Sequence, residues 1–303
     1  MTVHQFLRIV EIRTKLISLS GVLIGTAYSA AVDHRIVLSG GIVMLCAVLA
    51  VDMATTGFNS FFDFFHGVDR VAVNREKDKV LVHQNVPAGL ALITSLALYG
   101  VAAVFGIWLA VLTSPVVILV GTVCMLVGFL YNTGPLPISR TPAGELFAGS
   151  FLGWVLVTLS IYVQRGRLEA ADLLVGVPST LIVASILTVN NTCDIDGDRR
   201  AGRRTLSIMV GRTGGETLVY LLGAGAFLSA SALSWYGILP RIVLAGALLA
   251  ALVSVPVYFR MHVRGYSHTT KGPSMGSISR IFLYFALGIT VPLTVEALGW
   301  TPL

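Results

Sequence analysis

The stretch VLSGGIVMLCAVLAVDMATTGFNSFFDFFHGVD (residues 37–69) joins a long apolar run to a group of amide and acidic side chains. The run over 37–62 contains one charged residue, Asp52. About 20 predominantly apolar residues are enough to cross a bilayer as a helix. The stretch therefore predicts a membrane-spanning helix that ends in polar side chains, among them Asn59 and Asp63.

The whole chain shares this apolar character. Of its 303 residues, 55% are hydrophobic and 12% are charged, whereas a soluble domain has roughly 25% charged residues. The mean hydropathy is +0.83. We find nine runs of spanning length: 15–32, 37–62, 87–112, 115–132, 144–163, 172–191, 216–236, 240–259 and 279–298. We expect an all-α, polytopic membrane protein, with residues 1–303 forming one transmembrane domain around a central apolar chamber.

Two features argue against a disulfide-rich protein, a zinc protein and a cleaved signal peptide. Three scattered cysteines, Cys46, Cys124 and Cys193, argue against a disulfide framework or a zinc site. The N-terminal segment lacks the small-residue cleavage signature of a signal peptide.

The basic residues predict the orientation. With the N-terminus in the cytoplasm and nine spans, only Arg35, Arg165, Arg167 and Arg241 of the 21 lysines and arginines lie outside. Such an excess inside is what the positive-inside rule predicts. It explains the net charge of +6 without nucleic acid, so we expect no nucleic-acid partner. We expect a protein of the cell inner membrane with its C-terminus outside and its active site at the cytoplasmic face.

A second polar cluster, NNTCDIDGD (190–198), ends another run about 130 residues after the first. Asn190, Asp194 and Asp198 are spaced i, i+4 and i+8, which places them on one face of a helix. Asp196 points away from that face, towards solvent or a cap.

The first cluster repeats part of this spacing. Asn59 and Asp63 lie one turn apart, and Asp69 follows six residues later. A helix that ends at Gly67 would fold Asp69 back towards Asp63.

Both clusters predict metal and phosphate chemistry. A carboxylate at membrane depth costs on the order of 3 kcal/mol and by default implies a partner. Mg²⁺ prefers oxygen ligands and completes its shell with water and substrate phosphate. Basic residues that suit a phosphate follow each cluster: Arg75, Lys77 and Lys79 after the first, and Arg199, Arg200, Arg203 and Arg204 after the second. The combination favours chemistry on a lipid diphosphate.

At these motifs the chain resembles the UbiA superfamily of intramembrane prenyltransferases. NSFFDFFHGVD (59–69), NNTCDIDGDRRAGRRTLSIMVGR (190–212) and YNTGPLPISRTPAGE (131–145) resemble the 1,4-dihydroxy-2-naphthoate polyprenyltransferase branch, in the same order along the chain. One departure is Ser60, which stands where an aspartate is frequent in the superfamily.

The resemblance implies a reaction and its residues. Polyprenyl diphosphate is bound through two Mg²⁺ ions, and the prenyl group passes to an aromatic acceptor. For dihydroxynaphthoate, CO₂ is lost as well, a step of menaquinone biosynthesis. The implied catalytic and metal-binding residues are Asp63, Asp69, Asp194 and Asp198. The implied substrate-binding residues are Asn59, Asn190, Tyr131, Glu145, Lys79, Arg203 and Arg204. Membrane lipids surround the chain.

Several positions keep two readings. Tyr131 faces the reacting cation or a phosphate, or is an interfacial tyrosine. Glu145 belongs to the acceptor site or acts as a polar brace, or it is only a favourable charge at a helix N-terminus. Asp52 binds the acceptor or holds two helices together. The stretch 264–279 reads as a flexible cytoplasmic loop, which serves as a lid or only as a linker.

Rival functions also remain open at this point. A CDP-alcohol phosphotransferase gathers its aspartates in one short segment, unlike this chain. A cation-coupled transporter places such charges near the bilayer midplane. Within the superfamily the acceptor alternatives are 4-hydroxybenzoate, homogentisate and a lipid.

Overall fold

The computed structural model describes residues 1–65, 80–84 and 86–299, and within these ranges the chain is helical, with no β-strand. The described residues include eight helical segments long and apolar enough to cross a membrane: Ile12–Asp33, Leu38–Phe65, Ala88–Leu112, Gly144–Arg165, Asp172–Cys193, Leu206–Trp235, Ile242–Arg264 and Lys271–Ala297. The remaining predicted span is the apolar helix Val116–Asn132, which has 17 residues. The predicted all-helical, polytopic fold is confirmed, with one span shorter than expected.

The chain divides into two compact units. Unit 1 comprises Met1–Leu19 and Ile42–Ile138, and unit 2 comprises Ser20–Gly41 and Ser139–Leu303. Helix α2 (Leu16–Asp33) therefore lies mostly in unit 2, and α3 (Leu38–Phe65) lies mostly in unit 1. A single domain around a central chamber stays a prediction.

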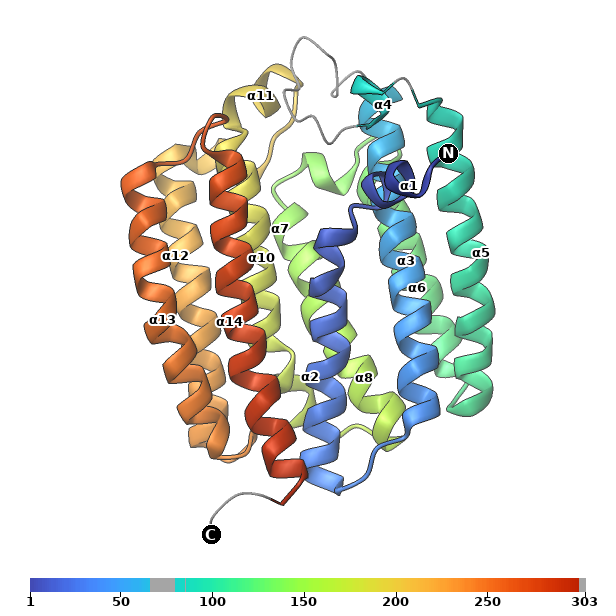
Figure 1. Ribbon diagram of the computed structural model, residues 1–303, viewed down its shortest axis with the longest axis vertical. Coiled ribbons are helices and arrows are strands. Elements are labelled where there is room, and N and C mark those ends of the chain that lie inside the picture. The colour runs from blue at the N-terminus through green and yellow to red at the C-terminus, as the bar shows by residue number, and fades with distance from the viewer. Residues whose placement is uncertain (66–79, 85, 300–303) are drawn as a thin grey trace. The chain divides into compact units, whose positions relative to one another are not determined.

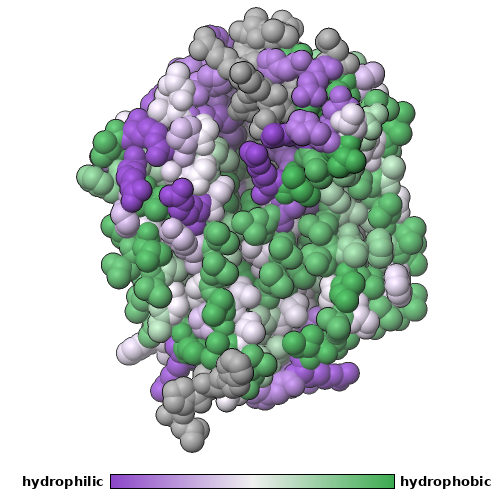
Figure 2. Space-filling view, in the orientation of Figure 1, coloured by the Kyte–Doolittle hydropathy of each residue, from purple (hydrophilic) through white to green (hydrophobic). Residues whose placement is uncertain are grey.

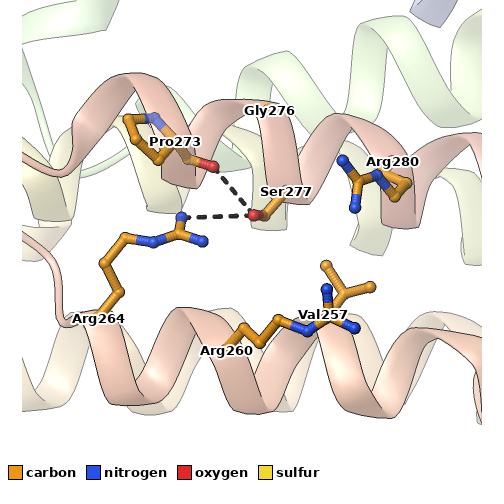
Figure 3. A pocket seen from close by; sticks show the side chains of 7 residues that line it. All are labelled: Val257, Arg260, Arg264, Pro273, Gly276, Ser277 and Arg280. Carbon is orange, nitrogen blue, oxygen red and sulfur yellow. Dashed lines mark hydrogen bonds between the residues drawn. The ribbon is translucent and has the colours of Figure 1, made fainter.

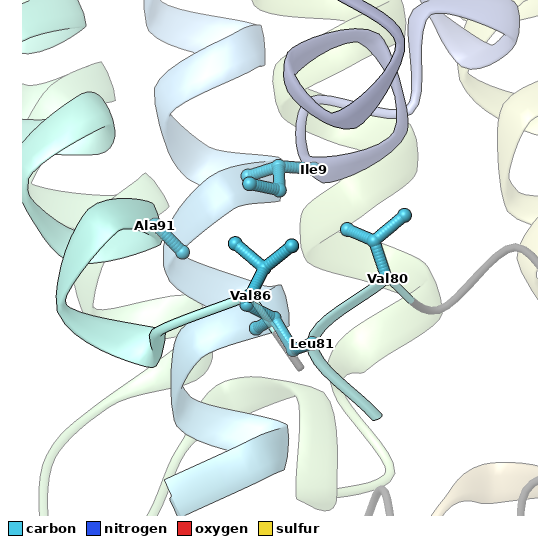
Figure 4. Packing of buried hydrophobic residues seen from close by; sticks show 5 residues of the cluster. All are labelled: Ile9, Val80, Leu81, Val86 and Ala91. Atoms are coloured by element: carbon cyan, nitrogen blue, oxygen red, sulfur yellow. The ribbon is translucent and has the colours of Figure 1, made fainter. Parts of the chain in front are cut away.

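In unit 1, short helices support the end of α3. Helix α1 (Val3–Ile9) packs against α4 (Val80–His83), and α5 (Ala88–Leu112) packs against α6 (Val116–Asn132). Figure 4 shows the apolar cluster that joins α1, α4 and α5, formed by Ile9, Val80, Leu81, Val86 and Ala91. Phe61 of α3 is partly buried against this cluster. The last turns of α3, which carry the first motif, are thus held by the packing of α1, α4 and α5.

A buried ion pair connects the start of α2 to α3 within unit 1. Lys15 Nζ lies 2.5 Å from Asp52 Oδ1 and 2.7 Å from Thr56 Oγ1. Ser18 Oγ donates to Asp52 Oδ2 over 2.6 Å. Both carboxylate oxygens of Asp52 therefore have donors from the neighbouring helix, which supports its role in holding the helices together.

Unit 2 contains most of the remaining helices: α7 (Gly144–Gly149), the π-helical turn η3 (Ser150–Val155), α8 (Leu156–Arg165), α9 (Asp172–Val175), α10 (Val177–Cys193), α11 (Ile195–Arg200), α12 (Leu206–Trp235), α13 (Ile242–Arg264) and α14 (Lys271–Ala297). Helix α10 packs along α12, and α13 runs beside α14 (Figure 1). At the α13–α14 contact, a Cβ on Gly246 or Gly288 would overlap the backbone of the other glycine. Small residues allow such close approach between membrane helices.

Two spans of unit 2 begin earlier than predicted. Helix α12 starts at Leu206, and Gly211 (φ 74°, ψ 175°) interrupts its helical backbone in a conformation that favours glycine. Helix α14 starts at Lys271, so the prediction of a loop over 264–279 was wrong for its second half. Only 265–270 form a turn.

Candidate active site

The second motif lies where α10 ends and α11 begins. Asp194 has φ −98° and ψ 7°, so the regular helix is interrupted at this residue. The backbone nevertheless keeps its turn, because the Asp194 N–H donates to Asn190 O and the Asp198 N–H donates to Asp194 O. The predicted i, i+4, i+8 spacing survives across the break.

Burial separates the aspartates of this motif. Asp198 is 7% exposed and the Asp194 side chain 18%, whereas the Asp196 side chain is 73% exposed and pairs with Arg212 over 2.8 Å. Asp196 therefore faces away from the other two, as the spacing predicted.

Basic side chains lie around Asp194 and Asp198. Lys271 Nζ lies 2.6 Å from Asp194 Oδ2, and His268 Nδ1 lies 3.3 Å from Asp194 Oδ1. Arg203 Nη1 lies 3.4 Å from Asp198 Oδ1. The side chain of Arg204 is exposed, and its backbone N–H donates to Arg140 O. The second motif is thus an acidic pair with basic groups on several sides.

Sequence reasoning missed Lys271 and His268. Both come from the stretch that reads as a linker, HTTKGPS (268–274), where glycine, serine and threonine mask the signal. The usable signal was a histidine and a lysine, three residues apart, in the segment that precedes the last apolar run. Only the fold brings them to Asp194.

Internal bonds hold the turn that carries His268. Thr270 Oγ1 donates to Gly265 O over 2.9 Å, and the backbone O of Tyr266 accepts from Arg212. Tyr266 is 3% exposed. Burial, followed by its hydrogen bond to Tyr220, raises the pKa of the Tyr266 hydroxyl, which therefore stays protonated. The turn is fixed against α12, so the position of His268 is built into the fold.

Glu145 is a buried acid beside this motif. It is 3% exposed, and its Oε1 accepts from Asn191 Nδ2 over 2.8 Å, which joins α7 to α10. Its Oε2 is buried without a hydrogen-bond partner in the described part of the chain. Asn190, next to Asn191, is half-buried. Glu145 thus braces two helices with one oxygen and keeps the other available for a ligand.

The described part of the first motif, residues 59–65, sits on unbroken helix in unit 1. Asn59 and Asp63 lie one turn apart near the end of α3, and both are half-buried. Ser60, the departure from the superfamily pattern, is 6% exposed and donates to Ile9 O over 3.2 Å. Position 60 therefore serves the packing of α1 on α3.

Tyr131 lies near this motif's helix within the same unit. It is half-buried on the last turn of α6. The adjacent Asn132 donates to Thr55 O over 3.1 Å, and Phe129 meets Phe58 at 5.2 Å between ring centroids. These contacts fix the end of α6 against α3. Asp69 and Lys79 lie outside the described residues.

The donor chemistry fits Mg²⁺. Among residues 1–65, 80–84 and 86–299, no three His, Cys, Asp or Glu side chains form a metal-binding group. Each motif still presents carboxylate and amide oxygens, from Asn59 and Asp63 in one unit and from Asn190, Asp194 and Asp198 in the other. Mg²⁺ needs only one or two protein carboxylates together with phosphate oxygens and water.

Sequence comparison gives relatives along most of the chain. It is 33% identical over 224 residues to 1,4-dihydroxy-2-naphthoate octaprenyltransferase of Bacillus subtilis, covering 71% of this chain and 70% of that protein. It is 30% identical over 197 residues to the Mycobacterium tuberculosis protein of that name, covering 64% and 65%. It is also 31% identical to UbiA prenyltransferase domain-containing protein 1 of Rattus norvegicus, covering 68% and 59%.

Solved structures share the fold. A UbiA homologue from Archaeoglobus fulgidus bound to GPP and Mg²⁺ has a TM-score of 0.68 at 13% identity, covering 96% of this chain and 100% of that one. A UbiA homologue from Aeropyrum pernix has a TM-score of 0.65 at 21% identity, covering 91% and 98%.

The sequence model described as the UbiA prenyltransferase family matches residues 18–287, a range that contains both motifs. The chain therefore belongs to the UbiA prenyltransferase family and is a membrane-embedded enzyme that transfers prenyl groups.

Proposed function

We propose that this enzyme transfers a polyprenyl group from polyprenyl diphosphate to 1,4-dihydroxy-2-naphthoate, with loss of CO₂, in menaquinone biosynthesis. The relatives from Bacillus subtilis and Mycobacterium tuberculosis, both named as octaprenyltransferases for this acceptor, support the choice. Other aromatic acceptors, such as 4-hydroxybenzoate and homogentisate, are the alternatives.

The observation that carries the proposal is the second motif. Two largely buried carboxylates, Asp194 and Asp198, are paired with Lys271 and Arg203. Such a site offers oxygens to a metal ion and, from neighbouring segments, donors to phosphate. A diphosphate with bound Mg²⁺ presents both partners that this arrangement requires.

The two units then act as one prenyltransferase domain. Asp63 and Asp69 of one motif, and Asp194 and Asp198 of the other, would hold Mg²⁺, with two ions in all. Asn59, Asn190, Lys79, Arg203 and Arg204 bind the diphosphate, together with Lys271. Bound Mg²⁺ supplies Lewis-acid stabilisation of the negative charge on the leaving diphosphate.

The chain's own residues direct the rest of the reaction. The allylic C–O bond breaks, and the electron pair leaves with the diphosphate, where the basic side chains hold it. A ring carbon of the acceptor forms the new C–C bond, and its carboxylate departs as CO₂, which balances the charge. Tyr131 faces the allylic cation, and Glu145 Oε2 accepts a hydrogen bond from the acceptor. The apolar helices exclude water.

The orientation follows from the basic residues. We place the N-terminus and the active site at the cytoplasmic side of the cell inner membrane, and the C-terminus outside. Membrane lipids surround the apolar helices, and the polyprenyl tail enters the protein from the lipid bilayer.

The test is a reconstitution. The purified protein is incubated with Mg²⁺, geranylgeranyl diphosphate and, in separate reactions, 1,4-dihydroxy-2-naphthoate, 4-hydroxybenzoate or homogentisate, and products are identified by mass. We expect a prenylated, decarboxylated naphthalene product and Mg²⁺-dependent diphosphate release. If product formed only from another acid, the assignment of the acceptor would be wrong. Transport without diphosphate release would overturn the assignment as an enzyme.

A further inference from the structure

A basic pocket lies between α13 and α14, away from both motifs along the chain. It has a volume of about 410 Å³ and is lined by Val257, Arg260, Arg264, Pro273, Gly276, Ser277 and Arg280. Figure 3 shows Arg260 and Arg264 extending from α13, with Ser277 and Arg280 opposite them on α14. None of the residues assigned to prenyl transfer lines this pocket.

The charge of the pocket is uncompensated. Three of the seven lining residues are arginines and none is acidic. Arg264 donates to Ser274 Oγ and Ser277 Oγ, at 3.5 and 3.4 Å. Within the part of the chain that the structure describes, no carboxylate pairs with any of the three arginines. Like charges that share a pocket repel one another, and a bound anion relieves that repulsion.

The guanidinium groups indicate which anion fits. Arginine presents a planar fork of donors that matches phosphate oxygens in a bidentate manner. Ser277 Oγ, which donates to Pro273 O over 2.9 Å, also accepts from Arg264 on the facing helix (Figure 3). The positive-inside rule explains why arginines occur at this end of the helices. It does not explain why three of them converge on one pocket.

Apolar surface continues from the pocket along both helices. Leu249 and Val253 of α13 lie 11 and 7 residues before Arg260, close to whole numbers of turns, and are 62% and 40% exposed. Leu283 and Leu287 of α14 follow Arg280 on a similar face and are 37% and 50% exposed. Figure 2 shows hydrophobic residues (green) along much of the surface over these helices, next to hydrophilic ones (purple). A ligand with a phosphate head and apolar tails satisfies both surfaces.

We propose that the α13–α14 pocket binds the phosphate group of a membrane phospholipid whose acyl chains lie along the exposed apolar positions of the two helices, namely Leu249, Val253, Leu283 and Leu287. Basic pockets between membrane helices at the cytoplasmic side are known to bind anionic lipid headgroups. A free phosphate ion is the other source of the same chemistry.

The test compares matched arginine variants of the full chain in a neutral detergent. Arg260→Gln/Arg280→Gln removes two charges from the pocket, and the single variants Arg260→Gln and Arg280→Gln provide a second series. Arg241→Gln is the control, because Arg241 is an exposed arginine just before α13, at the end remote from the pocket. Each protein is titrated with phosphatidylglycerol, with phosphatidylcholine and with inorganic phosphate, and bound ligand is counted by native mass spectrometry.

We expect phosphatidylglycerol to bind the wild type and Arg241→Gln in preference to phosphatidylcholine, and to bind the double variant at least about tenfold more weakly. Binding of inorganic phosphate alone, lost in the same variant, supports the site and identifies a free anion as its ligand. Equal phosphatidylglycerol and phosphate binding by the wild type and every pocket variant would overturn the proposal.

Discussion

Each unit of the molecule contains an ion pair between a lysine and an aspartate, and the two ion pairs have different surroundings. Lys15 and Asp52 in unit 1 are 2.5 Å apart, and Lys271 and Asp194 in unit 2 are 2.6 Å apart. The side chains of the first pair are 4% and 14% exposed, and those of the second are 19% and 18% exposed. Distance alone therefore does not distinguish them.

The neighbours do distinguish them. Ser18, Thr56 and the Asp52 carbonyl complete the first pair, so it ties the start of α2 to α3. The second pair joins two helix ends, with His268 on the other carboxylate oxygen and the buried Asp198 one turn away. The comparison teaches that a buried ion pair is structural when helix neighbours saturate it, and suited to ligand exchange when it lies at helix ends beside further acids.

The largest expected effect is a loss of turnover when Asp63 or Asp194 is replaced, which other acidic residues such as Asp196 should not show. Asp194→Asn and Asp63→Asn should each lower kcat/KM at least about a thousandfold, because in the proposed mechanism metal-dependent stabilisation of several kcal/mol rests on these carboxylates. The measurement is turnover of geranylgeranyl diphosphate with Mg²⁺. Asp196→Asn is the matched control, since its exposed side chain faces Arg212, and it should stay within about twofold of the wild type. Near-normal turnover of Asp194→Asn would contradict the assigned metal site.

Breaking the unit 1 pair should act on stability. Lys15→Met leaves the Asp52 carboxylate buried without its cation, which is expected to lower the free energy of unfolding by about 3 kcal/mol. Thermal unfolding in detergent measures the change. The double variant Lys15→Met/Asp52→Leu should recover most of the loss, because both charges are gone. A Lys15→Met protein that melts like the wild type but turns over slowly would instead place this pair in the reaction.

Breaking the ion pair in unit 2 should act on substrate binding instead of on stability. Lys271→Gln is expected to raise the KM for the prenyl diphosphate about tenfold to a hundredfold, since a charge-assisted hydrogen bond contributes about 1.5–3 kcal/mol. Lys271→Arg keeps the charge and should restore part of the affinity. Steady-state kinetics and melting are measured together. A large loss of stability at unchanged KM would make this pair structural, like the one in unit 1.

Substitutions of Glu145 should give the smallest effect, and they separate its two roles, in binding the acceptor and in bracing α7 against α10. Glu145→Gln retains an oxygen for Asn191, so its melting temperature should stay close to the wild type, while the KM for the aromatic acceptor rises by up to about tenfold. Glu145→Ala leaves Asn191 without its acceptor and should lose about 1–3 kcal/mol of stability. An unchanged acceptor KM in Glu145→Gln would limit Glu145 to bracing α7 against α10.

Much of the fold was readable from local pattern. Apolar runs of spanning length predict membrane helices because the bilayer requires every backbone group to be bonded within its own segment. The largest errors fell at helix starts: residues 206–215 and 271–278 are polar or glycine-rich enough to read as loops, yet they are helical apart from the interruption at Gly211. Their helices form because tertiary contacts, such as Lys271 on Asp194, stabilise polar first turns.

The sequence by itself determined that this is an all-helical membrane protein of a prenyl-transferring family, and which acids and amides form its two motifs, because membrane insertion and helical spacing depend only on residues near one another in the chain. Only the tertiary structure decided which basic side chains accompany those acids and Asp52. His268 and Lys271 lie more than 70 residues from Asp194, and Lys15 lies 37 from Asp52. No local pattern encodes such contacts, because they arise when helices distant in sequence pack together.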